Sequence, residues 1–324
     1  MESLVPPPLV HSENPVLQRL QSRLRLKHFV LLRALSDHRT LHLAAAALSI
    51  TQPSATKLLQ DVESALGMPL FLRHARGLEP TTLGAEVVAY ARLLLGQMGH
   101  FSADLDAKRL GGHGFLSVGA ILGAMPDSVA QAVAVLKARY PRLTIRLLGD
   151  TSDQMMQLMG NHQLEVAVCR ISTVELAAQL HYEPLGNEAL RFFVSARHHR
   201  AGEPPRGLAD LLGEPWVVQP LPTPSRVRWE EAFSAQGLPR PANLIECSSV
   251  FAALQVVEHL HGVALLPEPV ARDAVQAGRI VALPLLPGIV LPEFGIVHRR
   301  GAQLSAPAQE FVRTLRRLHE PGAA

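Results

Sequence analysis

The sequence predicts a helical N-terminal domain followed by a larger α/β domain, and three observations support that division. First, the excess positive charge is confined to residues 19–80, which hold nine Lys and Arg against four Asp and Glu. Second, residues 24–66 carry apolar side chains at helical spacing, interrupted by short polar breaks. Third, strand-like and helix-like segments alternate after a glycine-rich break at residues 111–114. At 324 residues the chain is long enough for two or three domains of ordinary size.

The N-terminal segment and the cysteines indicate where the protein works. Residues 1–23 begin with MESLVPPPLVHSENP, which lacks the basic start and apolar core of a secretion signal, so we expect a flexible arm there. No apolar run approaches the roughly 20 residues that cross a bilayer. Cys169 and Cys247 provide neither a disulfide framework nor a metal-type cluster. We therefore expect a cytoplasmic protein with no membrane partner and no cofactor.

Two helices joined by a tight turn are predicted after a first helix at residues 24–35. Thr40 can cap a short alanine-rich helix, and a brief turn at residues 49–50 leads to Thr51 and the next helix. That next helix has one apolar face, formed by Ala55, Leu58, Leu59, Val62 and Leu66. Gly67 then provides a C-terminal stop. This order is typical of a helix-turn-helix, in which the second helix enters the major groove of DNA.

The opposite face of that helix carries hydroxyl and amide side chains near its start. Such groups can reach base edges, and Lys57 can reach a phosphate. A capped surface helix would carry similar residues, so the order of the elements, rather than any one residue, favours DNA binding. The DNA-binding candidates on this helix are Thr51, Gln52, Pro53, Ser54, Thr56 and Lys57.

The segment after Gly67 predicts a two-stranded wing. Residues 70–72 can form a strand, Arg76 and Gly77 a turn, and Leu78 a return strand that ends at Pro80. Arg73 and Arg76 are then available for the DNA backbone or the minor groove. We therefore predict a winged helix-turn-helix over residues 24–81.

Residues 82–110 are predicted to form one long helix that links the two domains. Apolar side chains recur along it at alternating intervals of four and three, which is a seven-residue repeat. A helix buried inside one domain can show the same repeat, but the position between two domains favours dimerisation. The predicted dimer face consists of Val87, Ala91, Leu94, Met98, Phe101 and Leu105.

The remainder of the chain predicts an α/β domain with two lobes. The segments FLSVGAI, TIRLLGD and LEVAVCR have the character of strands and are separated by amphipathic helices. A second block repeats the alternation, and EFGIVHR with PAQEFVRTLRRLH adds a returning strand and a last helix. We expect a regulatory domain at 114–320, with subdomain I at 114–183 and 286–320 and subdomain II at 184–285. Two such lobes leave a cleft between them.

The residues of the helix-turn-helix and wing resemble the signature of the LysR-type transcriptional regulators. The matching residues are Ala44, Ala45, Leu48, Thr51, Gln52, Pro53, Thr56, Lys57, Val62, Glu63, Gly67, Leu70, Phe71, Arg73, Thr81 and Gly84. Thr56, Lys57 and Val62 stand where serine, arginine and leucine are common in the family. Lys57 offers DNA a point charge in place of the planar fork of arginine.

The resemblance continues through YPRLTIRL, LEVAVCR, RWEEAF and GVALLP and implies the fold and the partners. It implies an α/β periplasmic-binding-protein-like (type 2) effector domain of two subdomains. It also implies a homo-oligomer, either a homodimer or a homotetramer, that binds and bends double-stranded promoter DNA. The two-fold symmetry of a dimer predicts that this DNA is an imperfect palindrome. RNA polymerase is a further candidate partner, and no enzymatic activity is expected.

By the same resemblance, a small-molecule effector binds in the cleft between the subdomains. The effector-binding candidates are Ala120, Ile121, Thr151, Ser152, Thr223, Ser225, Ser248 and Ser249. Hydroxyl and backbone N–H groups at helix starts form anion sites, although helix caps and turns use the same residue types. The loop at residues 119–123 lacks the hydroxyl groups common in family members that bind carboxylates. A sugar or an apolar-bodied ligand is therefore as admissible as a carboxylate.

Three rival functions have weaker support in the sequence. An enzyme is disfavoured because the chain has no G-x-S-x-G, H-E-x-x-H or Walker motif. The histidine pair at residues 198–199 and the pair at 259 and 261 have no acidic or cysteine partner at ligand spacing. A transporter's solute-binding protein would share the two-lobed fold but would not need the first 110 residues. A redox sensor would need reactive thiols, whereas Cys169 and Cys247 are better explained as buried apolar residues.

Overall fold

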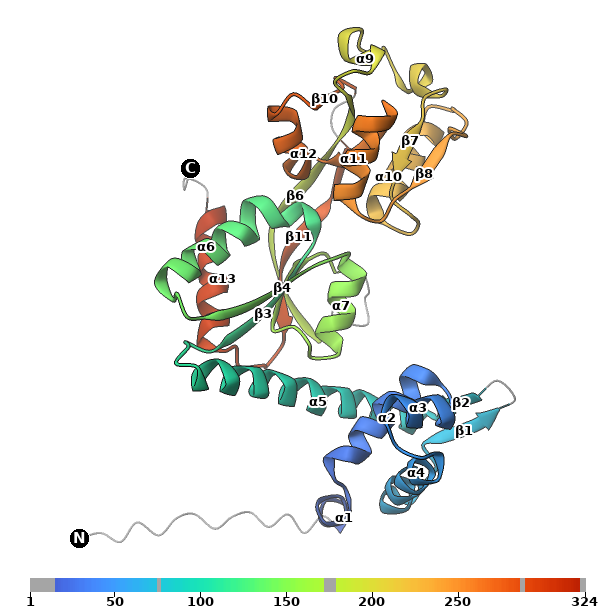
Figure 1. Ribbon diagram of the computed structural model, residues 1–324, viewed down its shortest axis with the longest axis vertical. Coiled ribbons are helices and arrows are strands. Elements are labelled where there is room, and N and C mark those ends of the chain that lie inside the picture. The colour runs from blue at the N-terminus through green and yellow to red at the C-terminus, as the bar shows by residue number, and fades with distance from the viewer. Residues whose placement is uncertain (1–14, 75–76, 172–178, 286–288, 321–324) are drawn as a thin grey trace, which may run out of the picture. The chain divides into compact units, whose positions relative to one another are not determined.

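The chain forms two compact units, residues 1–101 and 102–324, which are drawn in Figure 1. None of the described helices combines the length and the apolar character that crossing a lipid bilayer requires. The computed structural model describes residues 15–74, 77–171, 179–285 and 289–320.

The first unit is a small helical domain with a two-stranded wing. Its core contains Leu31, Leu59 and Val62, because the apolar face predicted after Thr51 packs against the preceding helices. Its elements are α1 (Pro15–Arg23), α2 (Leu26–His38), α3 (Leu41–Ala47), α4 (Gln52–Leu66), β1 (Phe71–His74), β2 (Gly77–Pro80) and the first part of α5 (Thr82–Arg109).

The flexible arm predicted for residues 1–23 is wrong for its second part. Residues 15–23 form α1, which contacts α4, and Leu24 N donates to Leu20 O at the end of that helix. The sequence PVLQRLQSR has apolar residues at helical spacing, which is sufficient for a short helix after the proline-rich start. Residues 1–14 lie outside the described part of the chain.

The wing is held against the C-terminal end of α2. The two strands are antiparallel, with Phe71 opposite Pro80 and His74 opposite Gly77. Leu78 N donates to Arg39 O at 2.6 Å, which ties the return strand to the residue that caps α2. Gly77 has a φ of +130°, and a Cβ placed there would lie 2.4 Å from Arg39 O. Only glycine allows this approach of the two backbones.

The second unit is built on one nine-stranded mixed sheet. The strand order is β4-β3-β5-β11-β6-β9-β7-β8, and β10 pairs with β6 outside that path. The strands are β3 (Phe115–Ala120), β4 (Thr144–Gly149), β5 (Val166–Cys169), β6 (Leu180–Ser195), β7 (Trp216–Val218), β8 (Leu244–Glu246), β9 (Val263–Pro267), β10 (Ile280–Ala282) and β11 (Ile289–Arg299). The helices are η1 (Leu122–Ala124), η2 (Met125–Val129), α6 (Ala130–Arg139), α7 (Ser152–Gly160), α9 (His199–Gly202), η3 (Leu208–Leu211), α10 (Pro224–Ser234), α11 (Val250–Leu260), α12 (Glu268–Gln276) and α13 (Ala306–His319).

The helices divide this unit into two lobes with separate cores. In the first lobe, α6 and α13 lie together on one face of the sheet and α7 covers the other (Figure 1). In the second lobe, Trp229 and Phe233 of α10 pack on one face, against Trp216. Helices α11 and α12 cover the opposite face. Because helices cover both faces of the sheet, the side chains on both faces of β3, β5, β7 and β9 are buried. This explains why the sequences of these strands are continuous apolar runs.

Two long strands connect the lobes. Strands β6 and β11 are antiparallel neighbours, from Leu180 opposite Arg299 to Leu190 opposite Ile289. Leu180 belongs to the core of the first lobe, whereas Leu190 belongs to that of the second. The pairing shifts register between Leu291 and Phe294, where the strands pass from one lobe to the other.

Candidate functional site

The start of α4 has a helix cap built from the predicted residues. Thr51 is the N-cap, and its Oγ1 accepts a hydrogen bond from Ser54 N at 3.4 Å and lies 2.8 Å from Ser54 Oγ. Pro53 fits in the first turn, where its missing N–H is not needed. Thr56 Oγ1 donates to Gln52 O at 3.0 Å. Three of the hydroxyl side chains expected at a DNA interface therefore also stabilise the helix itself.

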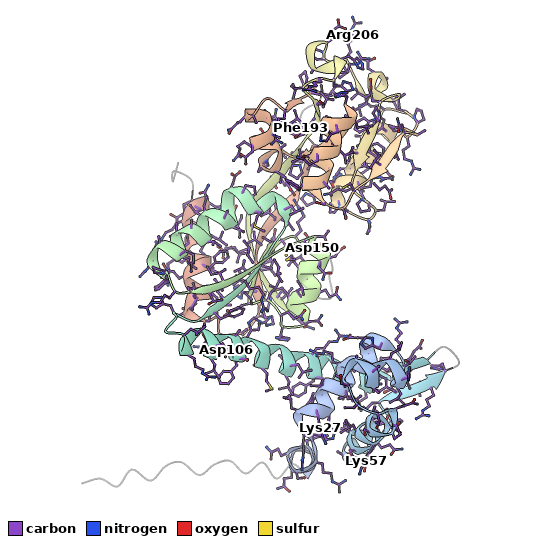
Figure 2. All side chains as sticks on the ribbon, in the orientation of Figure 1. Lys27, Lys57, Asp106, Asp150, Phe193 and Arg206 are labelled. Atoms are coloured by element: carbon purple, nitrogen blue, oxygen red, sulfur yellow. The ribbon has the colours of Figure 1, made fainter. Side chains whose placement is uncertain are left out.

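The side chains of Gln52 and Lys57 face solvent. Both are exposed, and neither makes a hydrogen bond or ion pair within the described part of the chain (Lys57 is labelled in Figure 2). Ala55 and Leu59 on the opposite face are buried. The helix thus presents amide, hydroxyl and ammonium groups on one side of a rigid element.

Two acidic residues of the first unit, Glu63 and Asp37, are engaged in internal contacts. Glu63 Oε1 accepts from Leu70 N at 2.8 Å and from Phe71 N at 3.4 Å, which ties α4 to the wing. Asp37 forms an ion pair with Arg92. Arg73 on β1 is exposed, and the predicted contact residue Arg76 lies outside the described residues. The unengaged basic side chains Lys57 and Arg73 face solvent on the helix and wing that carry the other DNA-binding candidates.

The predicted dimer face of α5 is exposed only toward its C-terminal end. Met98, Phe101 and Leu105 are exposed, with 63% of Phe101 accessible, which is unusual for a large apolar side chain. Val87 and Leu94 are half-buried. Ala91 is fully buried in the core of the first unit, so its assignment to the dimer face is wrong. The seven-residue repeat continues into a stretch where the helix packs on its own domain.

A cavity of about 680 Å³ lies between the two lobes of the second unit. Seven of the eight effector-binding candidates line it: Ile121, Thr151, Ser152, Thr223, Ser225, Ser248 and Ser249. The eighth, Ala120, does not, because it is the last residue of β3 and its side chain is buried in the core of the first lobe. The lining comes from the ends of strands and the starts of α7, α10 and α11, where a two-lobed α/β protein has free backbone groups.

Most of the cavity hydroxyls also have structural partners. Thr151 and Ser249 are N-caps, accepting from Gln154 N and Ala252 N at 3.3 Å each. Thr223 Oγ1 donates to Pro220 O at 2.7 Å. Ser248 is exposed and has no hydrogen bond within the described residues. Capping and ligand binding are compatible, because a hydroxyl oxygen that accepts one bond still has a proton to donate.

A buried ion pair in the cavity wall was not found from the sequence. Arg170 and Glu188, 8% and 6% exposed, pair through Nη2 and Oε2, and Arg170 Nε donates to Pro292 O at 2.7 Å. Gly123 makes room for this pair, since a Cβ there would lie 1.6 Å from Glu188 Oε1. The only sequence signal was Arg170 directly after the apolar run VAVC, because Glu188 lies among other polar residues in its strand.

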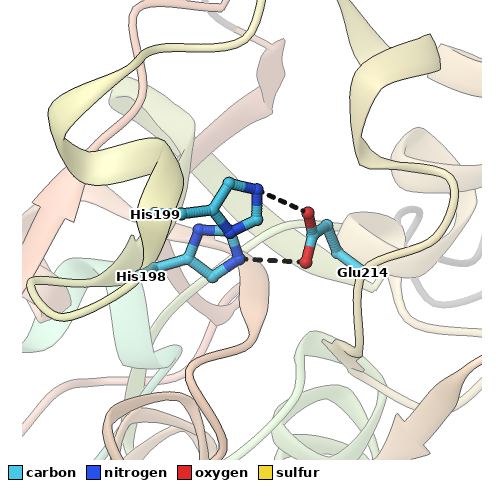
Figure 3. A group of neighbouring side chains, drawn as sticks. All are labelled: His198, His199 and Glu214. Atoms are coloured by element: carbon cyan, nitrogen blue, oxygen red, sulfur yellow. Dashed lines mark hydrogen bonds and ion pairs between the residues drawn. The ribbon is translucent and has the colours of Figure 1, made fainter.

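Two adjacent histidines and a glutamate form the one cluster of metal-ligating groups in the described residues. His198 Nε2 lies 3.1 Å from Glu214 Oε2, and His199 Nε2 lies 3.2 Å from Oε1, with the two rings stacked (Figure 3). The expectation that this pair lacks an acidic partner is therefore wrong.

The hydrogen bonds of His198 fit a helix cap better than a metal ligand. His198 Nδ1 accepts from Arg200 N at 3.0 Å, so in the neutral ring the proton is on Nε2 and is donated to Glu214. A metal ion on Nε2 would place a proton on Nδ1, facing that N–H. Burial also lowers the pKa of His198, which keeps the ring neutral.

Comparison with known proteins connects both regions of the chain to one family. Residues 26–85 match the family model described as bacterial regulatory helix-turn-helix protein, lysR family, and residues 110–320 match the LysR substrate binding domain. Together they cover most of the chain. The chain belongs to the LysR family. It is a DNA-binding transcriptional regulator whose C-terminal domain takes a small-molecule effector, and the members of this family are regulators rather than enzymes.

Relatives of this LysR-family regulator match along almost its whole length. The HTH-type transcriptional regulator GbpR of Azospirillum brasilense is 31% identical, over 92% of this chain and 87% of its own. The SDS degradation transcriptional activation protein of a Pseudomonas species is 30% identical, over 90% of this chain and 94% of its own. Among solved structures, the LysR family regulator CbnR has a TM-score of 0.62 at 21% identity, covering 92% of this chain and all of that one. The winged helix-turn-helix and the two-subdomain effector domain predicted from the sequence are thus confirmed.

Cys169 of this LysR-family regulator is poorly suited to redox sensing. Cys169 is fully buried in β5, and burial raises the pKa of its thiol to about 12. Cys247 is half-buried and donates to Ser249 O. A thiol without thiolate character reacts slowly with oxidants, so the redox alternative loses its support at Cys169.

Proposed function

We propose that this LysR-family regulator reads an imperfect palindrome in promoter DNA with the start of α4, and that an effector in the cleft cavity controls that binding. The observation that carries the proposal is the set of exposed, unengaged side chains Gln52 and Lys57 opposite a buried apolar face. In this proposal Gln52, Ser54 and Thr56 lie nearest the bases, because amide and hydroxyl groups discriminate base edges in the major groove.

The basic side chains would bind the sugar-phosphate backbone. Lys57 and Arg73 are exposed on α4 and on the wing, and the acidic residues Asp37 and Glu63 nearby are engaged elsewhere. Arg76, which lies outside the described residues, belongs to the same proposal because of its position in the sequence alone. Phosphate contacts position the protein without selecting a sequence, and they make binding dependent on salt.

A symmetric oligomer would place two copies of α4 on one DNA segment. The exposed apolar side chains Met98, Phe101 and Leu105 on α5 support a dimer contact, because water contact of such a row is unfavourable. A homodimer binds two DNA half-sites related by two-fold symmetry, and a homotetramer binds two such pairs of half-sites.

The effector would act by favouring one arrangement of the oligomer. Thr151, Ser152 and Ser249 line a cavity between lobes that are joined by two strands, so a ligand can contact both lobes. A ligand that binds both arrangements equally changes nothing, whereas differential affinity shifts the population and the DNA bend. We propose that the protein binds DNA and effector in the cytoplasm. We also propose that the change in DNA bend alters the activity of RNA polymerase bound at the same promoter.

Selection from genomic DNA tests the proposal. The purified full-length protein is incubated at fixed salt with fragmented DNA of the genome that encodes it, with and without pooled small metabolites. We expect enrichment of a short imperfect palindrome and a shift in its occupancy when the pool is present. Uniform weak binding that disappears as salt rises would contradict the proposal and favour a solute-binding role for the two lobes.

A further inference from the structure

The charged residues of the cavity wall limit what its ligand can be. Of the described lining residues, Arg170 is the one with a permanent positive charge, whereas Asp150 and Glu188 are both acidic. Arg170 already donates to Glu188 and to Pro292 O, and both partners of the ion pair are buried. A ligand carboxylate would therefore find no unpaired cation in the described wall. It would also be repelled by Asp150, whose charge no cation of the wall balances. Bringing an unpaired anion into such a site is costly.

The start of α7 carries acidic side chains of its own, Asp150 before the helix and Asp153 in its first turn. Helix starts attract negative charge, and α7 begins in the cavity wall. Asp150 lies next to that helix start, where its Oδ1 accepts a hydrogen bond from Thr151 N at 2.7 Å. The protein's own carboxylate therefore lies where it repels a ligand anion (Asp150 is labelled beside α7 in Figure 2).

The remaining polar groups of the wall include both hydrogen-bond donors and acceptors. The hydroxyl oxygens of Thr151, Ser152 and Ser249 each accept a backbone N–H, so each has its proton left to donate. Asp150 and Glu188 supply carboxylate oxygens that can only accept. An alcohol donates one hydrogen bond and accepts others, so a molecule with several hydroxyl groups can satisfy both kinds of group at once.

The apolar part of the wall suits the carbon skeleton of such a molecule. Ile121, Leu254 and Leu291 line the cavity, and Phe251 stands among the lining residues with 74% of its side chain exposed. An aromatic face can cover the C–H side of a sugar ring. A volume of about 680 Å³ is within the range of small-molecule sites.

We propose that the cavity binds an uncharged polyhydroxylated molecule, a small sugar, and discriminates against the carboxylate analogue of that sugar. The inference rests on the proposed function of the cavity as the effector site. Glu188 is its specificity-determining residue, because it cancels the charge of Arg170, and Asp150 binds the ligand hydroxyl groups.

Matched sugar pairs test the inference on the full-length protein. Glucose, galactose and mannose are each compared with their own uronate by isothermal titration calorimetry and thermal shift. We expect at least one hexose to bind and its uronate to bind about tenfold or more weakly. A uronate that binds as tightly as its hexose would overturn the inference, and so would a failure of all three hexoses to bind.

Two variants and a control assign the effect to the named residues. Asp150→Asn weakens sugar binding by about tenfold, because a hydrogen bond to a carboxylate is replaced by one to a neutral amide. Glu188→Gln frees Arg170 and tightens uronate binding by about tenfold. Glu258→Gln removes a carboxylate that pairs with Arg279 outside the cavity, and it leaves both affinities as in the wild type. Equal effects of Asp150→Asn and Glu258→Gln on sugar binding would overturn the inference.

DNA binding by the same samples distinguishes a wrong ligand class from a wrong effector function. DNA occupancy of the selected palindrome is measured with and without the sugar. Sugar binding without any change in occupancy would refute the effector function and leave the ligand class standing. A change in occupancy caused by a uronate alone would refute the ligand class and leave the effector function standing.

Discussion

The start of α4 and the cleft cavity treat their polar groups in opposite ways. On α4, Gln52 and Lys57 are exposed and unengaged. In the cavity, Arg170 is paired with Glu188, and the hydroxyl groups accept bonds from helix starts. Exposed charges can stay unpaired because water solvates them until DNA replaces it, whereas a charge buried in a cavity wall needs a partner. In the proposed function, DNA contacts side chains whose charges are unpaired, whereas the effector contacts the hydroxyl protons and oxygen lone pairs that have no partner within the protein.

The largest effect is expected where a buried charge loses its partner. Glu188→Ala leaves Arg170 in the cavity wall without a counter-charge, and we expect the free energy of unfolding to fall by about 3–5 kcal/mol. Glu258→Ala is the matched control, because it breaks an ion pair with the exposed Arg279 and costs about 1 kcal/mol or less. Urea unfolding of both variants measures the difference. Equal losses would show that the cavity pair is no more buried than a surface pair.

On α4 the comparison predicts a change in sequence preference. Gln52→Ala should reduce discrimination at one base pair of each half-site by about 1–3 kcal/mol. Arg73→Ala should weaken binding about evenly across sequences and lower the salt dependence by about one charge. Competition assays with single-base variants of the palindrome, repeated at several salt concentrations, measure both. The same profile for both variants would contradict the roles assigned to them.

The sequence predicted α4 better than it predicted the cavity, for a physical reason. The face of α4 follows from a local repeat, so Gln52 and Lys57 could be assigned from spacing alone. The cavity is assembled from distant segments, and its lining residues were identified through the family resemblance rather than from a local repeat. The pair of Arg170 and Glu188 was missed, since pairing across strands leaves no periodic signal.

Removing one helix cap in each unit should cause two similar losses of stability, smaller than that of Glu188→Ala. Thr51→Ala and Ser249→Ala each remove a hydroxyl that accepts a backbone N–H, and each should cost about 1 kcal/mol of stability. The two losses should fall on different units, the first on residues 1–101 and the second on residues 102–324. Hydrogen exchange localises them. Loss of protection in the same unit for both variants would contradict the separation.

The smallest expected effect is the pH dependence of folding stability, which has the same direction in both units. Burial lowers the pKa of His28 in the first unit and of His198 in the second. The folded protein therefore holds fewer protons than the unfolded chain just below the ordinary histidine pKa of about 6.5. The stability contributed by the neutral rings is present above that pH and is lost as the pH falls below it. Calorimetry between about pH 7.5 and about pH 5.5 should show a decline, and His198→Gln should reduce it. A flat profile would contradict the burial of both rings.

The central claim is that a ligand in the cavity controls DNA binding by α4. Its direct measurement is the DNA affinity of the full-length protein at fixed salt, with and without pooled metabolites. The wild type is compared with Ser248→Trp, which fills the cavity, and Ser234→Trp, which lies outside it on α10. We predict that the pool changes the affinity of the wild type and of Ser234→Trp by about fivefold or more and has no effect on Ser248→Trp. An equal change in all three proteins would contradict the claim.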